Sequence, residues 1–145
     1  MNQAAAAVLL IEDSEIDSLL LRDALAGDLL GRFDVTTVER LGVGLQLLAQ
    51  QHFDVVLLDL GLPDSQGLAT FEKLHAAAPE VPVVVFSGNL DTRAATEAVQ
   101  RGAQDYLIKG QTAWVTAPRA IRYAVERQRS QALLQQNERR LRLLI

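Results

Sequence analysis

Runs of consecutive apolar residues that end at a charged or hydroxyl residue recur along the chain. The clearest run covers residues 55–58 and is followed by Asp59. Because it is apolar at successive and not at alternate positions, it predicts a strand covered on both faces, as in a parallel sheet between two layers of helices. Three other predicted strands, at residues 8–11, 83–86 and 106–108, are followed in the same way by Glu12 and Asp13, by Ser87 and Gly88, and by Lys109.

Helical stretches of suitable length alternate with the strands. A fifth strand is predicted at residues 33–38, and helices are predicted at residues 16–26, 41–51, 68–78 and 92–101. Five strand–helix units with short loops predict an α/β fold with a doubly wound parallel sheet, the flavodoxin-like (βα)5 arrangement with strand order 2-1-3-4-5 and an extended C-terminal helix. That order places the first, third, fourth and fifth strands side by side, so we expect their polar ends to gather at one edge.

Five short motifs stand in order at these strand ends. They are Glu12-Asp13, Asp59, Leu-Gly-Leu-Pro-Asp at residues 60–64, Ser87-Gly88, and Tyr-Leu-Ile-Lys at residues 106–109. Together they resemble the response-regulator receiver domain of two-component signal transduction, the CheY-like family. The similarity extends over roughly residues 6–128. Each motif is common by itself, but their joint order at the ends of the correct strands is specific.

Asp59 is suited to accept a phosphoryl group, because a carboxylate is already ionised near neutral pH and needs little activation. Phosphoryl transfer then depends mainly on positioning and on neutralising the charge of the phosphoryl oxygens. Mg²⁺, for which Mn²⁺ can substitute, prefers hard oxygen ligands, and we expect Asp13 and Asp59 to bind it directly. Glu12 is expected to act through water, and the resemblance adds the backbone carbonyl of Gly61 as a ligand.

The resemblance also implies roles for Lys109, Ser87 and Tyr106. Lys109 supplies a fixed positive charge, and Ser87 supplies a hydroxyl that can donate to a phosphoryl oxygen. In receivers this hydroxyl moves toward the phosphate and an aromatic residue, here Tyr106, turns inward behind it. The change is expected to bias a two-state surface formed by the fourth helix, the fifth strand and the fifth helix. The implied partner is a histidine kinase or phosphotransfer protein, and the implied domain is a regulatory phosphoacceptor and not an enzyme.

Other interpretations of the same residues stay open. Ser14 fits a helix N-cap. Taken alone, Asp59 could be a turn former and Lys109 a solvated surface lysine. A phosphorylation-independent interaction module and a true enzyme of the same architecture are the other functional classes. A haloacid-type phosphatase needs a second aspartate two residues after its nucleophile, where this chain has Gly61. A flavodoxin needs a hydroxyl-rich loop after the first strand, where this chain has two acidic residues.

Pro118 bears on where the last helix begins, because a proline inside a helix removes a donor and clashes with the preceding turn. With Thr116 as the N-cap, Pro118 falls in the first turn, where the missing donor costs little. Trp114 is then expected in the loop that follows Lys109. Gly110 stands where receivers commonly have proline, so this loop is expected to differ in shape.

Beyond residue 128 the chain reads as a polar helix with one apolar stripe. The stripe has a three-four spacing and consists of Leu134, Asn137, Leu141 and Leu144. This is the pattern of a short coiled-coil seam, in which asparagine sets the register at some cost in stability. We expect a receiver domain at residues 1–128 and a helical linker or coiled-coil extension at residues 129–145, leading to an output domain and supporting a homodimer through the last helix and tail. The alternative is a solvated helical tail.

Composition narrows the remaining choices. The 145 residues suffice for one compact domain with an appended helix, and a net charge of -4 offers no basic surface for nucleic acid, so direct nucleic-acid binding is not expected. The apolar stretch at residues 4–11 is too short to cross a membrane and lacks a basic flank. The absence of cysteine excludes disulfides and fits the expected cytoplasmic location.

Overall fold

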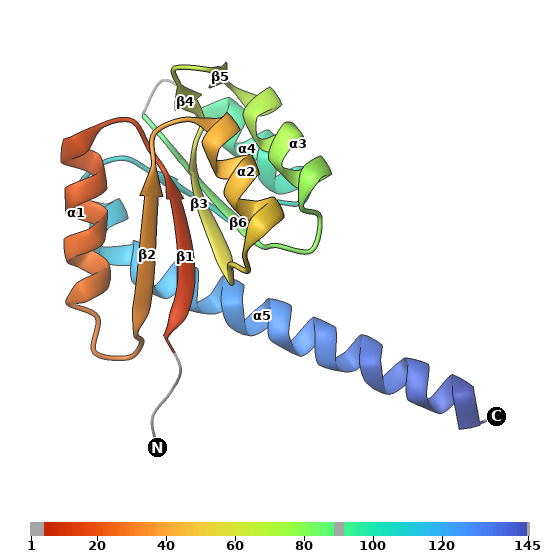
Figure 1. Cartoon of the computed structure of the whole chain (residues 1–145). Coiled ribbons are helices and arrows are strands. Elements are labelled where there is room, and N and C mark those ends of the chain that lie inside the picture. Colours follow the sequence, from red (N-terminus) through yellow and green to blue (C-terminus); the bar gives the residue numbers. More distant parts are fainter. Residues whose placement is uncertain (1–4, 89–91, 145) are drawn as a thin grey trace.

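The computed structural model describes residues 5–88 and 92–144, and its centre is a five-stranded parallel sheet (Figure 1). The strands lie in the order β2-β1-β3-β6-β7, which is the predicted order 2-1-3-4-5 of the main strands. Their bounds are β1 (Ala6–Ile11), β2 (Phe33–Val38), β3 (Val55–Asp59), β6 (Val83–Ser87) and β7 (Asp105–Ile108). The predicted flavodoxin-like α/β fold is confirmed.

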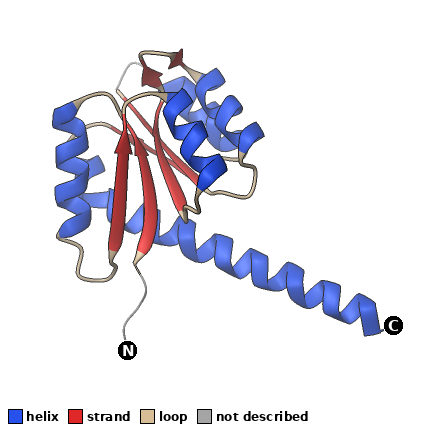
Figure 2. Cartoon of the chain, viewed as in Figure 1, coloured by secondary structure: helices blue, strands red, loops and turns tan. Residues whose placement is uncertain are grey.

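Two layers of helices cover the sheet, one on each face (Figure 2). The helices are α1 (Glu15–Ala26), α2 (Leu41–Gln50), α3 (Leu68–Ala77), α4 (Thr92–Gln100) and α5 (Gln111–Leu144). Apolar residues of α1 and α5 share one core with the first face of the sheet. Those of α2, α3 and α4 share a second core with the other face. The sheet is therefore covered on both sides, as the consecutive apolar runs predicted.

The central strand β3 is buried along its whole length. Val55 and Leu57 belong to the core beneath α1 and α5, whereas Val56 and Leu58 belong to the core beneath α2, α3 and α4. Strand pairing then aligns the carboxyl ends of the sheet. The pairs nearest that edge are Ile11 with Leu58, Asp59 with Phe86, and Ser87 with Ile108. The polar residues that follow or end these strands therefore meet at one edge.

A short antiparallel hairpin that the sequence did not predict follows β3. It pairs β4 (Gly61–Leu62) with β5 (Ser65–Gln66) and stands beyond the carboxyl edge of the sheet (Figure 1). Each arm has only two residues, which is too short to show a hydrophobic period. Gly67 closes the hairpin with a φ of 73°, a left-handed conformation that favours glycine.

The predicted start of the last helix was wrong. α5 begins at Gln111, so Trp114 lies in the helix and not in a loop, and Pro118 lies inside the helix. Ala113 is buried and Trp114 packs against the same core. Burial of this first turn outweighs the hydrogen bond that the proline removes. The Thr116 hydroxyl does not cap the helix but donates within it, to the carbonyl oxygen of residue 112 at 2.9 Å.

α5 runs through residue 128 without interruption and extends past the body of the domain to Leu144 (Figure 1). Every residue from 129 to 144 is exposed. Among the described residues, no helix combines the length and the apolar character that crossing a bilayer requires. The tail is thus a helix with little packing against the described part of the domain, where Arg129 contacts Asp54 at 3.8 Å.

Candidate functional site

Asp59 is the last residue of β3 and is buried at the carboxyl edge of the sheet. Its two carboxylate oxygens have separate partners. Oδ1 accepts a hydrogen bond from the backbone amide of Gly61 at 3.0 Å, and Oδ2 accepts one from Lys109 Nζ at 3.1 Å. The carboxylate is therefore held in one orientation, with the Lys109 ammonium group beside one oxygen.

The ammonium group of Lys109 links three carboxylates. Nζ lies 2.9 Å from Asp17 Oδ2, 3.1 Å from Asp59 Oδ2 and 3.2 Å from Glu12 Oε1. It also lies 5.3 Å from the ring centroid of Phe86. Burial alone would lower the pKa of Lys109, but the hydrogen bond with Asp17 and the charges of Asp59 and Glu12 more than offset this and raise the pKa above its usual range. Lys109 is therefore charged at every physiological pH.

Asp17 is a contact of this lysine that the sequence analysis missed. It lies in the first turn of α1, three residues after the predicted N-cap Ser14. Ser14 is the N-cap, as predicted, and its Oγ accepts a hydrogen bond from the Asp17 amide at 3.3 Å. The available signal was the place of Asp17, one turn after the acidic pair, from where its carboxylate can reach the same edge.

Glu12 is buried at the end of β1, with 1% of its surface exposed. Its Oε1 accepts hydrogen bonds from the Ser14 amide at 3.0 Å and from Lys109 Nζ at 3.2 Å, whereas Oε2 has no partner within the described residues. Burial raises the pKa of Glu12 to about 8, and the neighbouring carboxylate of Asp59 acts in the same direction. The site is therefore short of positive charge, even with Lys109 present.

Three carboxylates form a cluster suited to a metal ion. Oxygen atoms of Glu12, Asp13 and Asp59 lie within 4.8 Å of one another, with Asp13 exposed and the other two buried. All the donors are hard oxygens, and one buried Glu12 oxygen lacks a partner in the described part of the chain. This donor set fits Mg²⁺ and also Mn²⁺, as the sequence predicted.

Ser87 ends β6 and Lys109 directly follows the neighbouring strand β7, and the Lys109 amide donates to the Ser87 carbonyl oxygen at 2.8 Å. Ser87 is buried, yet its hydroxyl has no hydrogen-bond partner among residues 5–88 and 92–144. Tyr106 lies on β7, next to this edge, and is 38% exposed. The structure thus brings the predicted hydroxyl to the site and leaves the predicted aromatic residue at the surface.

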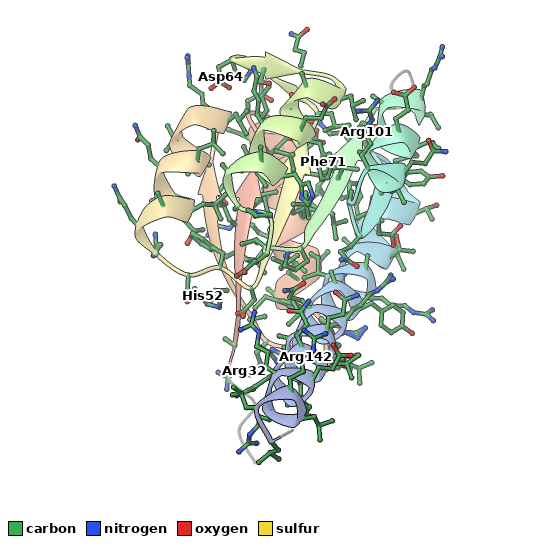
Figure 3. All side chains as sticks on the ribbon, turned by 90° about the vertical axis from the view of Figure 1, so that its right-hand side faces the viewer. Arg32, His52, Asp64, Phe71, Arg101 and Arg142 are labelled. Atoms are coloured by element: carbon green, nitrogen blue, oxygen red, sulfur yellow. The ribbon has the colours of Figure 1, made fainter. Side chains whose placement is uncertain are left out.

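The two histidines lie away from the acidic edge. His52 precedes β3, and its Nε2 lies 3.0 Å from Asp54 Oδ1. Figure 3 shows His52 far from Asp64, which marks the hairpin beyond the carboxyl edge. His75 stacks on Phe71 in α3, with ring centroids 5.2 Å apart. Neither histidine contributes to the site.

The sequence itself is similar to known signalling proteins. The family profile described as response regulator receiver domain matches residues 8–114. The chain is 37% identical over 102 residues to the KDP operon transcriptional regulatory protein KdpE of Escherichia coli K12, which covers 70% of this chain and 44% of that protein. It is 34% identical over 102 residues to the DNA-binding transcriptional regulator NtrC of the same strain, covering 70% of this chain and 21% of that protein. The chain therefore spans less than half the length of these curated relatives.

Solved structures share the fold. A CheY-like response regulator receiver domain protein from Methanospirillum hungatei matches with a TM-score of 0.75 and 20% identity, covering 88% of this chain and 99% of that one. A structure described as adenylate cyclase from Rhodopirellula baltica matches with a TM-score of 0.74 and 25% identity, covering 96% and 98%. On the sequence match and the acidic edge together, the chain belongs to the response regulator receiver domain family of two-component signalling, a family of regulatory phosphoacceptor domains and not of enzymes.

Proposed function

We propose that Asp59 accepts a phosphoryl group from the phosphohistidine of a histidine kinase or phosphotransfer protein. The observation that supports this most directly is the convergence of Asp59, Lys109 and the acidic pair at one edge. In the transfer, an Asp59 oxygen bonds to phosphorus as the P–N bond of the donor breaks, and the imidazole leaves with the electron pair of that bond. The product is an aspartyl phosphate.

Asp13, Asp59 and the backbone carbonyl of Gly61 would hold Mg²⁺ directly, and Glu12 would act through a water molecule. The bound cation supplies positive charge for the phosphoryl oxygens. Lys109 Nζ, at 3.1 Å from Asp59 Oδ2, supplies a second positive charge on the same side of the nucleophile. These groups position the phosphoryl group and neutralise it, which is most of what this reaction requires.

Phosphorylation would be read out through Ser87 and Tyr106. The buried Ser87 hydroxyl would donate to a phosphoryl oxygen, which gives it the acceptor it lacks among the described residues. Tyr106, now exposed, would turn inward behind it. The resulting change would bias the surface formed by α4, β7 and α5 between two arrangements.

The signal would pass along α5 to a C-terminal output module. We assign residues 1–128 to the receiver and residues 129–145 to a helical linker. The seam residues Leu134, Leu141 and Leu144 are 60%, 62% and 83% exposed. Cavities of about 350 and 550 Å³ between α5 and the body are instead lined by other positions of the helix, among them Gln128, Ala132 and Gln136. The seam is thus available to a second copy of this helix, which supports a homodimer.

The kind of output module is suggested by one relative. The Rhodopirellula structure described as adenylate cyclase matches 96% of this chain, which includes most of α5. A nucleotide cyclase is therefore a candidate module, whereas KdpE is named a transcriptional regulatory protein and NtrC a DNA-binding transcriptional regulator. We favour the cyclase class because that match extends along the helix.

Incubation with Mg²⁺ and acetyl phosphate, followed by intact-mass measurement, tests the phosphoacceptor. The wild type should gain the mass of one phosphoryl group, and Asp59→Asn should gain none. A phosphorylated histidine phosphotransfer protein should serve as donor in the same assay. An unmodified wild type with both donors, in a folded and magnesium-saturated sample, would refute the proposal.

The homodimer is tested by one substitution in the seam and a matched substitution on the other side of the same helix. Leu141→Arg places a charge in the seam and should convert dimer to monomer in sedimentation velocity. Gln136→Arg adds the same side chain on the side that faces the body and should leave the dimer intact. Equal dimer fractions for the two variants would contradict the seam.

A further inference from the structure

The carboxylate of Asp64 binds the N-terminal end of α2. Oδ1 accepts a hydrogen bond from the Leu41 amide at 2.9 Å, and Oδ2 accepts one from the Gly42 amide at 3.0 Å. These amides lower the pKa of Asp64, so the side chain is a carboxylate at neutral pH. The helix has no cap of its own, because the N-cap residue Arg40 makes no side-chain hydrogen bond and the first turn contains no acidic residue. Figure 3 shows Asp64 at this end of α2.

α2 is in turn fixed against the strand that carries the acidic pair. Gly44 of α2 is buried so close to Ile11 that a Cβ on the glycine would lie 2.5 Å from Ile11 Cδ1. Ile11 is the last residue of β1 and directly precedes Glu12 and Asp13. The first turn of α2 is therefore a fixed reference point for the position of that acidic pair.

The other end of the connection is Gly61, three residues before Asp64 in the same hairpin. The Gly61 amide donates to Asp59 Oδ1 at 3.0 Å. The Gly67 amide closes the base of the hairpin by donating to the Leu60 carbonyl oxygen at 2.7 Å. A buried hydrogen bond of 2.8 Å between hydroxyl groups ties the second arm to α3, namely Ser65 Oγ with Thr70 Oγ1. A hairpin tied at its base and tip moves as a unit, so its tip contact sets where Gly61 lies.

We propose that Asp64 is a positioning residue of the phosphoacceptor site. By binding α2, it holds the backbone of Gly61 in register with Asp59 and with Asp13, which is carried by the strand that packs on α2. Asp64 itself touches no reacting atom. This inference rests on the proposed function of Asp59, because it concerns the geometry in which the cation and the phosphoryl group are bound.

A cap that only stabilises α2 is the competing explanation, and Arg40 offers a way to separate the two. Its backbone is extended, with φ of -134° and ψ of 147°, as an N-cap requires. Arg40→Ser therefore gives the helix a cap from its own chain. In Asp64→Ala the free energy of unfolding should fall, and in the double variant Arg40→Ser, Asp64→Ala it should return toward the wild-type value.

Two readouts report on position and not on helix stability. The first is the Mg²⁺ dissociation constant from calorimetry, which should rise about tenfold in Asp64→Ala, the size of effect that removing an outer support of a metal site has. The second is hydrogen exchange of the Gly61 amide in metal-free protein, measured by NMR, which should become faster. Both defects should persist in the double variant, and Arg40→Ser alone should resemble the wild type.

Return of both quantities to wild-type values in the double variant would overturn the proposal, as would an Asp64→Ala protein that matches the wild type throughout. Neither result depends on phosphorylation. If the wild type takes no phosphoryl group, the proposed function fails. The exchange of the Gly61 amide still decides whether Asp64 positions the loop.

Discussion

Asp54 and Asp59 stand at the two ends of the same buried strand, and their surroundings are opposite in character. At the beginning of β3, Asp54 Oδ2 accepts a hydrogen bond from the Ala7 amide at 2.7 Å, and Oδ1 lies 3.0 Å from His52 Nε2 and 3.8 Å from an Arg129 guanidinium nitrogen. At the end of β3, Asp59 lies beside two further carboxylates. The Asp54 carboxylate therefore has a partner for each of its oxygens, whereas the carboxylates around Asp59 form an excess of negative charge.

The pKa values of the carboxyl groups at the two ends follow this difference. At Asp54 burial would raise the pKa, but the Ala7 amide and His52 outweigh burial and lower it. At Glu12 burial raises the pKa and the neighbouring Asp59 adds to the rise. Carboxylates that find donors within the chain stabilise the fold, while those crowded together cost stability until a cation arrives. The carboxyl edge is therefore the end of the strand that is suited to binding a cation.

Removing the carboxylate at each end should give the largest contrast. Asp59→Asn should abolish the phosphoryl adduct, and Asp54→Asn should keep it because that end has no part in the chemistry. Asp54→Asn should instead lose about 1–2 kcal/mol of the free energy of unfolding, as its charged hydrogen bonds weaken. Intact mass and urea denaturation measure the two effects. Loss of the phosphoryl adduct in folded Asp54→Asn would contradict the assignment of the chemistry to the Asp59 end of β3 alone.

Magnesium should stabilise the acidic end by mass action. At roughly one hundred times the dissociation constant, Mg²⁺ should add about 2.7 kcal/mol to the free energy of unfolding. Asp13→Asn should abolish this gain while leaving the metal-free protein at least as stable, because it removes a negative charge from the crowded acidic cluster. Asp34→Asn, an exposed aspartate on the edge strand β2, is the matched control. Persistent stabilisation of Asp13→Asn by Mg²⁺ would contradict the metal assignment.

The acidic end should also make the metal-free protein sensitive to pH. The folded state holds the Glu12 proton up to about pH 8, while the unfolded state releases it near the ordinary value of 4.5. Unfolding between these values releases a proton, so stability should fall as pH rises from 4.5 to 8. The loss should be on the order of a few kcal/mol, since each unit of pKa difference between the folded and unfolded states corresponds to about 1.4 kcal/mol. Denaturation curves for the wild type and Glu12→Gln across this range measure the loss of stability. An equally steep pH dependence in the variant would mean that another group, and not Glu12, causes it.

The smallest effect is expected where α5 leaves the body, beside Asp54. The Arg129 side chain is 61% exposed and its contact with Asp54 measures 3.8 Å. Arg129→Ala should therefore cost less than about 0.5 kcal/mol. Thermal denaturation beside Arg127→Ala, which removes another exposed arginine of α5, measures this cost. A loss well above the control would mean that Asp54 depends on Arg129 and not on the Ala7 amide.

Much of the fold could be predicted because the burial of a strand is reflected in the apolar residues of the strand itself. The run at residues 55–58 is apolar at every position, since both faces of β3 meet a core. The carboxyl-edge residues could then be placed by topology alone, and the structure brings Glu12, Asp13 and Asp59 together. Local rules failed where packing competed with them. Pro118 argued for a late start of α5, but burial of Ala113 and Trp114 extends the helix to Gln111.

The sequence alone determined the five strands of the main sheet, their order and which carboxylates share an edge, because hydrophobic periodicity and strand ends depend on neighbours along the chain. Only the tertiary structure decided which polar groups pair. Lys109 reaches Glu12 across 97 residues of sequence, and Asp64 binds α2 across 23. Lysine and aspartate occur at many surface positions, and nothing in their neighbours tells a partnered one from a solvated one. That choice is made by distances of about 3 Å, which exist only after the strands and helices have packed.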